Sequence, residues 1–121
     1  MKLYEKNAAE LSAMLQKKEC SAVELTQDVL ERIEEKSAVG AYVTRCEDCL
    51  DRAKAVDDAR AAGKELHPLA GIPIGIKDNI STKGIRTTCS SKMLGNYVPP
   101  FDATVMQPVR EAGMVITGKM N

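Results

Sequence analysis

The residue in this sequence most suited to chemistry is Lys77, which ends an apolar and glycine-rich stretch, "LAGIPIGIKDNI". Asp78 and Asn79 follow it directly as possible partners, and the next segment, "STKGIRTTCSSKM", supplies many small hydroxyl side chains. A lysine amine that is buried in such a site loses part of its preference for the charged form. It can then accept a proton from a serine hydroxyl and activate it as a nucleophile.

The alternative for Lys77 is an ordinary structural role. A lysine at the end of a strand can lie along the surface with its ammonium in water. One lysine after a strand is a weak signal, so the choice depends on what surrounds it. The adjacent polar residues, the hydroxyl-rich segment and the predicted open face of the strand favour the catalytic interpretation.

The alternation in "GIPIGIK" predicts a strand with all its isoleucines on one face and Lys77 on the other. These isoleucines are Ile72, Ile74 and Ile76. Gly71 and Gly75 leave the second face almost bare, so a backbone or a ligand can come close to it. Pro73 indicates either the start of a strand or an edge strand.

The cysteines are Cys20, Cys46, Cys49 and Cys89, and we expect all of them to be free thiols, because a reducing compartment and an adequate core make disulfides unnecessary. Cys46 and Cys49 form a CxxC pair, but a tetrahedral metal site needs four ligands and the only histidine is His67. The pair belongs to an apolar stripe at helical spacing, which favours core packing over metal binding or redox chemistry. The stripe also includes Leu50, Ala53 and Val56.

The segment "GMVITGKM", residues 113–120, has the GxxxxGK spacing of a phosphate-binding P-loop. It carries Met120 where a serine or threonine should hold Mg²⁺. A P-loop also follows its strand and opens a helix, whereas here the intervening residues are themselves β-rich. We therefore reject nucleotide binding by this segment.

Residues 1–63 are predicted to form a helical layer. Asn7 with Glu10, and Ser21 with Glu24, have the spacing of capping boxes, so two helices should begin near residues 8 and 22. The second should run to about residue 36. A short strand, "AYVT", is expected after Gly40, followed by a third helix from about residue 46 to a glycine cap at residue 63.

Residues 64–121 are predicted to form a strand-loop-helix-strand segment that carries Lys77. Asp102 is placed to cap a helix over residues 103–112, which Gly113 would end before the strand "MVIT". Pro108 conflicts with that helix, because an interior proline kinks or breaks it. The order of elements predicts a parallel crossover, and hence an α/β fold in which the helical layer is followed by the start of a mixed, largely parallel sheet with covering helices.

Length and composition predict one domain over residues 1–121, since the chain is 44% hydrophobic and too short for two cores. Its 17 basic and 17 acidic residues cancel, so the overall charge does not favour capture of nucleic acid or an anionic membrane. The N-terminal residues lack the apolar region of a signal peptide, and no apolar run is long enough to span a bilayer. We expect a cytoplasmic protein with no membrane partner and no cofactor or metal of its own.

The blocks "GIPIGIKDN", "TTCSSK", "PPFDATV" and "GKMN", within residues 68–121, resemble the amidase signature family. Within that family they are most similar to the glutamine-hydrolysing A subunits of tRNA-dependent amidotransferases. The resemblance implies an amide-hydrolysing enzyme with a serine nucleophile, a second serine that follows a cis peptide, and a lysine that deprotonates the second serine. By resemblance, Lys77 is that lysine.

The same resemblance implies partners and substrates. An A subunit releases ammonia from glutamine, a B subunit uses ATP and Mg²⁺ to activate the glutamate of Glu-tRNA(Gln), and a small C subunit holds the two together. We therefore expect B and C subunits as partners, and contact with tRNA mainly through the B subunit.

The resemblance covers roughly the first quarter of a full subunit, and the family's two serines lie downstream of the "GKxN" block. None of Ser81, Ser90 and Ser91 lies in that region, so none inherits the role of nucleophile. We expect this chain to be inactive alone and its sheet to be incomplete. The alternatives are a general amidase that acts on small carboxamides and a non-catalytic module whose helices, residues 8–62, dock a partner.

Overall fold

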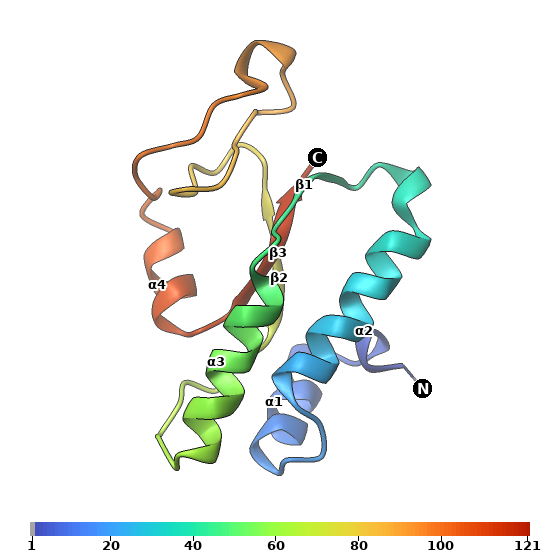
Figure 1. Cartoon of the computed structure of the whole chain (residues 1–121), viewed down its shortest axis with the longest axis vertical. Helices are drawn as coiled ribbons and strands as arrows, with labels where there is room; N and C mark the ends of the chain where they lie inside the picture. The colour runs from blue at the N-terminus through green and yellow to red at the C-terminus, as the bar shows by residue number, and fades with distance from the viewer. Residues whose placement is uncertain (1) are drawn as a thin grey trace.

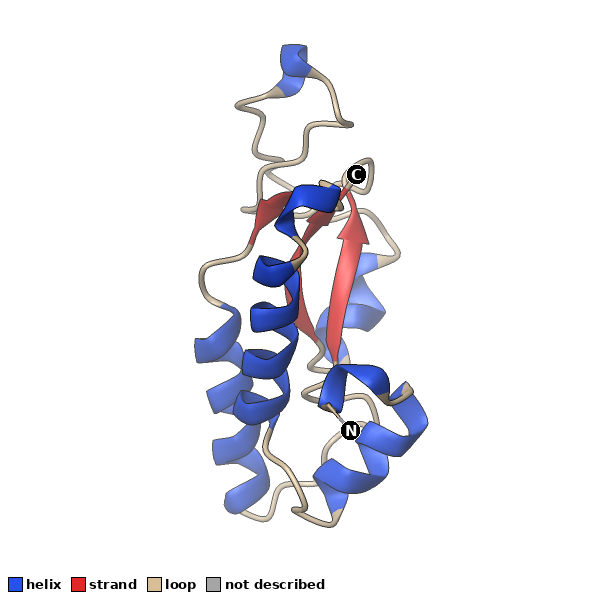
Figure 2. Cartoon of the chain, turned by 90° about the vertical axis from the view of Figure 1, so that its right-hand side faces the viewer, coloured by secondary structure: helices blue, strands red, loops and turns tan. Residues whose placement is uncertain are grey.

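The chain has an α/β fold in which helices cover both faces of a small sheet (Figures 1 and 2). The computed structural model describes residues 2–121. Its α-helices are α1 (Ala8–Gln16), α2 (Ala22–Glu35), α3 (Cys49–Ala61) and α4 (Met106–Glu111), and its strands are β1 (Tyr42–Arg45), β2 (Pro73–Lys77) and β3 (Val115–Met120). Short 3-10 helices are η1 (Leu3–Glu5), η2 (Ser37–Val39) and η3 (Lys92–Leu94). The predicted fold class is confirmed.

The sheet has the strand order β1-β3-β2 and is mixed. β2 and β3 are parallel and are connected through α4, as the strand-loop-helix-strand pattern predicts, while β1 pairs with β3 in the antiparallel direction. Pro73 is the first residue of β2, and β2 lies at an edge of the described sheet. Pro73 therefore begins a strand and also lies on an edge strand, and both alternatives predicted for it are correct. The sheet loses no hydrogen bond because proline lacks an N–H at this position.

The sheet separates two apolar clusters. On one face, α1, α2 and α3 bury Leu11, Leu15 and Leu25 together with Val115 of β3. On the other face, α4 contributes Met106, which is packed with Ile76 and Ile116. Figure 2 shows this layering, with α2 and α3 on one side of the strands and α4 on the other.

Both predicted capping boxes are present in the helical layer. The Asn7 side chain accepts the N–H of Glu10, and the Ser21 side chain accepts the N–H of Glu24, with the glutamate side chains bonded back in each case. The N-terminus of α2 has an additional cap that the sequence pattern does not reveal. The Asp57 carboxylate, on α3, accepts the N–H groups of residues 22 and 23 at 2.8 and 3.0 Å, so a tertiary contact satisfies the donors that the local box leaves free.

The third helix begins three residues later than predicted, at Cys49 instead of Cys46. The reason is that the Cys46 N–H donates to the carbonyl of Thr117 at 3.0 Å, which keeps Cys46 on the sheet beside β3. The predicted end is confirmed, because Gly63 has a φ of +77° and follows the last turn of α3. The Lys64 N–H then donates back to the Ala59 carbonyl, as in a Schellman motif.

The helix predicted over residues 103–112 is shorter, and Asp102 does not cap it. α4 begins at Met106, so Pro108 lies in its first turn, where backbone N–H groups have no intrahelical acceptor. This start removes the conflict that Pro108 raised. Asp102 instead accepts the N–H of Lys83 and pairs with Arg110 at 2.8 Å. Gly113, with a φ of +75°, ends the helix as predicted.

The expectation that the three isoleucines share one face of β2 is wrong for Ile72. Ile72 precedes the strand and is packed in the cluster of the helical layer, whereas Ile74 and Ile76 are packed with α4 on the opposite side. A register shift between Ile74 and Gly75 further interrupts the regular pairing with β3. The alternation of apolar residues here spans a turn as well as a strand.

The glycines beside β2 do not leave space for a ligand, which corrects the second expectation for this strand. A Cβ on Gly71 would lie 2.9 Å from the Ala22 Cβ, and one on Gly75 would lie 2.3 Å from the Met120 Sδ. Gly71 therefore permits close packing against α2, and Gly75 accommodates the Met120 side chain. The protein itself fills the bare face.

The rejected P-loop segment is part of the sheet. β3 runs from Val115 to Met120, longer than the predicted strand over residues 114–117, and includes the lysine of the "GK" pair. A backbone in a sheet ladder cannot wrap a phosphate. Among residues 2–121, no helix combines the length and apolarity needed to cross a membrane.

Candidate active site

Lys77 is the last residue of β2, and it lies opposite Met120 at the end of the parallel strand β3. Ligands of α/β sheets bind beyond the carboxyl ends of parallel strands, so Lys77 occupies the edge where an active site is expected. Its side chain is exposed, and within residues 2–121 its ammonium forms no hydrogen bond or ion pair. Residues 2–121 by themselves therefore do not bury Lys77.

Asp78 follows Lys77 and is completely buried. Its carboxylate accepts the N–H groups of Thr88 at 3.0 Å and Ser90 at 3.2 Å, and also the Thr88 hydroxyl. Burial alone would raise the pKa of Asp78, but these hydrogen bonds and the charge of Lys119 outweigh it and hold that pKa below its usual value. Asp78 is thus an ionised anchor for the following loop and is not a partner of Lys77.

The hydroxyl-rich loop folds back onto the ends of β2 and β3. Cys89 and Ser90 have φ values of +52° and +56°, a left-handed conformation that is uncommon for residues other than glycine. The Cys89 N–H donates to the Asp78 carbonyl at 2.9 Å, and the Ser90 hydroxyl donates to the Asn121 Oδ1 at 2.8 Å. The tertiary structure therefore brings Ser90 beside Asn121, the residue that follows β3.

The buried lysine of this region is Lys119, not Lys77. Lys119 has an exposed fraction of 0%, and its Nζ donates to the Ile80 carbonyl and to the Thr87 Oγ1, both at 2.7 Å. Burial lowers the pKa of Lys119, and the nearby charge of Asp78 only partly opposes this effect. The sequence analysis considered Lys119 only as part of the rejected P-loop. Its position inside a β-rich run was the one signal that it could be buried in the sheet.

A polar hollow of about 560 Å³ lies at the same end of the sheet. Among the described residues, its lining includes Arg86, Lys92 and Asn121 and no Asp or Glu side chain. Arg86 is held by neutral acceptors, since its guanidinium donates to the carbonyl of Gly95 at 2.8 Å and to the Thr44 hydroxyl at 3.0 Å. The hollow is positively charged, and Arg86 also ties β1 to the loop that follows β2.

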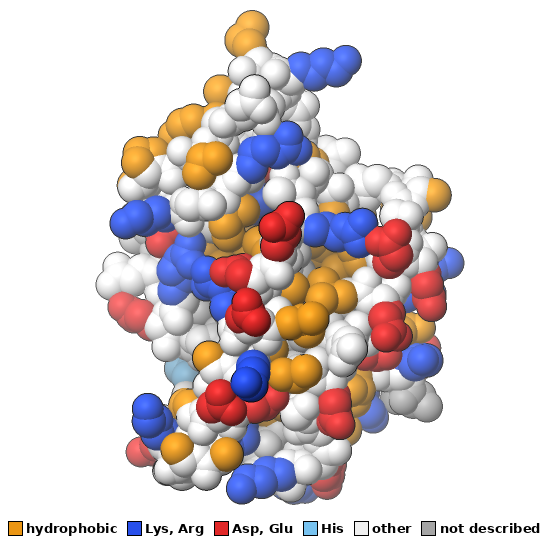
Figure 3. Space-filling view, in the orientation of Figure 1, with side chains coloured by type: hydrophobic (Ala, Val, Ile, Leu, Met, Phe, Trp, Pro, Cys, Tyr) orange, Lys and Arg blue, Asp and Glu red, His pale blue; other side chains and the backbone are white. Residues whose placement is uncertain are grey.

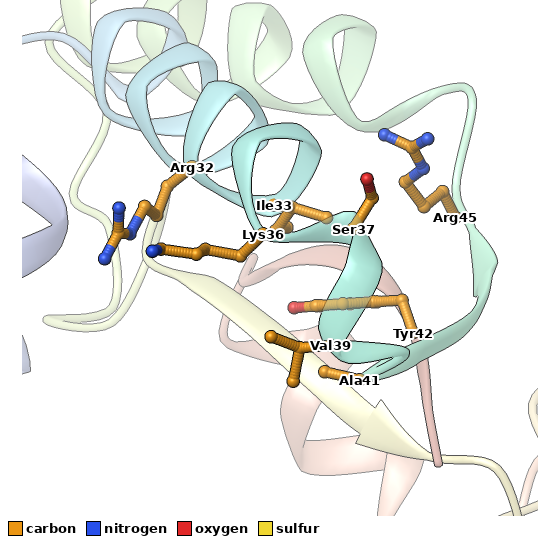
Figure 4. A pocket seen from close by; sticks show the side chains of 8 residues that line it. All are labelled: Arg32, Ile33, Lys36, Ser37, Val39, Ala41, Tyr42 and Arg45. Carbon is orange, nitrogen blue, oxygen red and sulfur yellow. The ribbon is translucent and has the colours of Figure 1, made fainter.

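A second hollow, of about 440 Å³, lies between the end of α2 and the edge strand β1 (Figure 4). Figure 4 shows Arg32 and Lys36 extending to one side of it and Arg45 lying on the other. Arg32 pairs with Glu35 at 3.3 Å, and Arg45 pairs with Glu34. None of the residues predicted for chemistry lines this hollow.

All four cysteines are free thiols, as predicted, and Cys89 is the exposed one. Cys46 and Cys49 are buried free thiols, and burial is the main cause that raises the pKa of Cys46 to about 11. Within residues 2–121, no group of three or more metal-ligating side chains is assembled. The predicted stripe is correct for Cys49, Ala53 and Val56, which are packed in the cluster of the helical layer. It is wrong for Cys46, which precedes α3 and is packed in the other cluster, and for Leu50, whose side chain is 38% exposed.

Relatives of known function match the whole chain. The chain is 52% identical to the A subunit of the glutamyl-tRNA(Gln) amidotransferase of Moorella thermoacetica, and 50% identical to the corresponding A subunit of Carboxydothermus hydrogenoformans. Each comparison covers 100% of this chain and 25% of the relative. This chain therefore spans about a quarter of the length of the curated relatives it matches.

Solved structures give the same grouping. The peptide amidase of Stenotrophomonas maltophilia superimposes with a TM-score of 0.89 at 34% identity, over 97% of this chain and 25% of the amidase. An amidase family protein of Bacillus anthracis superimposes with a TM-score of 0.88 at 27% identity, over 99% of this chain and 25% of that protein. A sequence model of the family described as Amidase matches residues 24–121. The chain belongs to the amidase signature family, and it corresponds to the N-terminal portion of its members.

Proposed function

We propose that these residues are the N-terminal portion of the A subunit of a glutamyl-tRNA(Gln) amidotransferase, which releases ammonia from glutamine. The observation that carries this proposal is the 52% identity, along the whole chain, with an A subunit of that enzyme. The runner-up is a general amidase that acts on small carboxamides. The similarity to a peptide amidase, at 34% identity, favours that alternative more weakly.

In the proposed mechanism, Lys77 is the proton acceptor. Its neutral amine takes the proton of a second serine, which in turn takes the proton of the nucleophilic serine as that oxygen attacks the glutamine amide. As the C–N bond breaks, the leaving nitrogen takes the proton back from Lys77 through the second serine and departs as ammonia, leaving an acyl-enzyme ester. Water, which gives up a proton to the same relay, then hydrolyses that ester to glutamate and restores the serine. The position of Lys77 supports this role, because it lies where two parallel strands end at their carboxyl side. Among residues 2–121, its ammonium has no hydrogen bond or ion pair that would compete with a serine.

The remaining parts of the site are proposed to come from downstream residues of the full-length protein. In the family, both serines follow the "GKxN" block, which here ends at Asn121. Exposed apolar side chains support the proposal that downstream residues pack on this chain, because an apolar surface patch usually marks an interface. These side chains lie on the segment before α4, and Figure 3 shows hydrophobic atoms over the upper left of the molecule, where this segment runs. They are Met93, Leu94, Tyr97, Val98, Phe101 and Val105.

The partners follow from the same proposal. A B subunit would use ATP and Mg²⁺ to activate Glu-tRNA(Gln) in the cytoplasm and would receive the ammonia, while a small C subunit would hold the other two together. The net charge of zero supports a division of labour in which tRNA binds mainly to the B subunit. The helical layer, α1 to α3, is the part of this chain that a partner would contact if docking were its main role.

The test is ammonia release by the full-length protein that carries these residues, assembled with its B and C subunits. We expect turnover of glutamine that exceeds turnover of small carboxamides by at least about tenfold. Equal or faster hydrolysis of small carboxamides would instead establish the general amidase. Release of ammonia from glutamine by residues 1–121 alone would refute the need for downstream serines, and binding of the C subunit without turnover in any assembly would support the docking module.

A further inference from the structure

Two ionisable side chains, Lys119 and Asp78, are completely buried directly behind the end of the strand that carries Lys77. Burial of charged groups is costly unless each is paired or hydrogen-bonded. A buried lysine that only filled space could be replaced by an apolar residue of similar size. The contacts of the two groups therefore indicate what their burial achieves.

Lys119 joins β3 to both ends of the segment that follows Lys77. Its Nζ contacts the carbonyl of Ile80, three residues after Lys77, and the hydroxyl of Thr87, each at 2.7 Å. The Thr87 hydroxyl also donates to the Ile85 carbonyl at 3.1 Å, so its lone pairs are free to accept from Lys119. One ammonium thus fixes the beginning and the end of this loop.

Asp78 completes the attachment from the strand β2. It receives the N–H groups of Thr88 and Ser90, and its own N–H donates to the Met120 carbonyl at 2.8 Å. The left-handed residues of the loop are held by these bonds in a conformation that they rarely adopt alone. The backbone that follows Lys77, the last residue of β2, is therefore hydrogen-bonded to β3.

We infer that Lys119 is a positioning residue for Lys77. Through Ile80 and Thr87, and together with Asp78, it holds the segment after Lys77 against β3, so that the Lys77 amine is kept at one place at the edge of the sheet. This inference rests on the proposed role of Lys77 as proton acceptor. Accurate placement of such a group matters because small displacements reduce proton transfer strongly.

The first test is amide hydrogen exchange in the full-length protein with Lys119→Met, which keeps most of the length of the side chain and removes its donors. We expect the amides of Thr88 and Ser90 to exchange at least about tenfold faster, while amides in the middle of β3 stay within about twofold. The matched control is Lys92→Met, at an exposed lysine near the same loop. Thr87→Val is the milder second variant, which removes one acceptor and decides the result if Lys119→Met does not fold.

The second test is the kinetics of glutamine hydrolysis by the full-length protein in its complex. We expect Lys119→Met to lower kcat about 10- to 100-fold with KM for glutamine within about twofold, and Thr87→Val to lower kcat less. Unchanged exchange at Thr88 and Ser90, or an unchanged kcat with faster exchange, would overturn the inference. If Lys77→Ala retains full activity, the proposed function fails instead, and the exchange experiment still decides whether Lys119 orders the loop.

Discussion

The helical layer and the carboxyl edge of β2 and β3 are stabilised by different interactions. The helical layer buries apolar side chains such as Leu15 and Leu25, and its helices begin at local capping boxes. The carboxyl edge buries Asp78, Thr88 and Lys119, all of which depend on specific hydrogen bonds. Apolar packing is nondirectional, whereas buried polar groups require particular partners. The hydrogen bonds that require particular geometry therefore lie beside Lys77, the proposed catalytic lysine.

The largest expected effect is on activity, and it tests whether the carboxyl edge is the functional region. In the complex of the full-length protein, Lys77→Ala should lower kcat for glutamine hydrolysis by about a thousandfold, because the proposed proton acceptor is lost. The stability of the protein should change little, since Lys77 is exposed in residues 2–121. Lys54→Ala, at an exposed lysine of α3 outside the candidate site, is the matched control and should retain activity. Loss of activity in both variants would remove the distinction between the two lysines.

The next effect concerns the helical layer. Leu25→Ala should lower the free energy of unfolding by about 3 kcal/mol, because Leu25 is completely buried between the helices and its truncation leaves a cavity. Urea denaturation monitored by circular dichroism measures this change. Val39→Ala, at a side chain that is 74% exposed, should have almost no effect. A loss below about 1 kcal/mol for Leu25→Ala would show that the layer repacks and is less ordered than its burial indicates.

Two glycines allow a sharper comparison within the sheet. A Cβ on Gly118 would lie 2.3 Å from the Thr44 backbone carbonyl, whereas a Cβ on Gly75 would lie 2.3 Å from the flexible end of Met120. We expect Gly118→Ala to cost about 2 kcal/mol and Gly75→Ala clearly less, because a side chain can move aside more easily than a strand. Thermal unfolding of the two variants measures the difference. Equal losses would indicate that Met120 is held as rigidly as the backbone.

The smallest expected effect is a pH dependence at the ion pair between Asp102 and Arg110. The Arg110 hydrogen bond is the main cause that lowers the pKa of Asp102 below its usual value. Because the unfolded carboxyl binds protons more readily, the pair contributes stability above the unfolded pKa of about 3.9, and this stability is lost as pH falls through the lower folded pKa.

Asp102→Asn should therefore reduce stability by about 0.5 kcal/mol at neutral pH and make the loss between about pH 5 and 2 shallower. Denaturation midpoints across that range provide the measurement. An identical slope in the variant would assign acid sensitivity to other groups, of which the buried Asp78 is the first to examine.

Much of the helical layer and the order of the strands were predictable from the sequence. These features depend on residues close together in the chain or on the order of the elements. The structure contains all of them: the two capping boxes, the glycines at residues 63 and 113 and the parallel crossover. The start of α3 was misjudged because Cys46 bonds to β3, and the start of α4 because Asp102 bonds to Lys83 and Arg110. In both cases a distant partner competed with a local signal.

The family pattern around Lys77 and the order of the elements that flank it follow from the residues in their chain order. Tertiary contacts alone determine which lysine is buried, because burial depends on the segments that cover a residue and not on its neighbours in the chain. Lys119 is enclosed by the loop over residues 80–90, whereas Lys77 ends β2 with its side chain exposed among residues 2–121. The same cause explains Gly71 and Gly75, whose empty space is filled by side chains from α2 and β3.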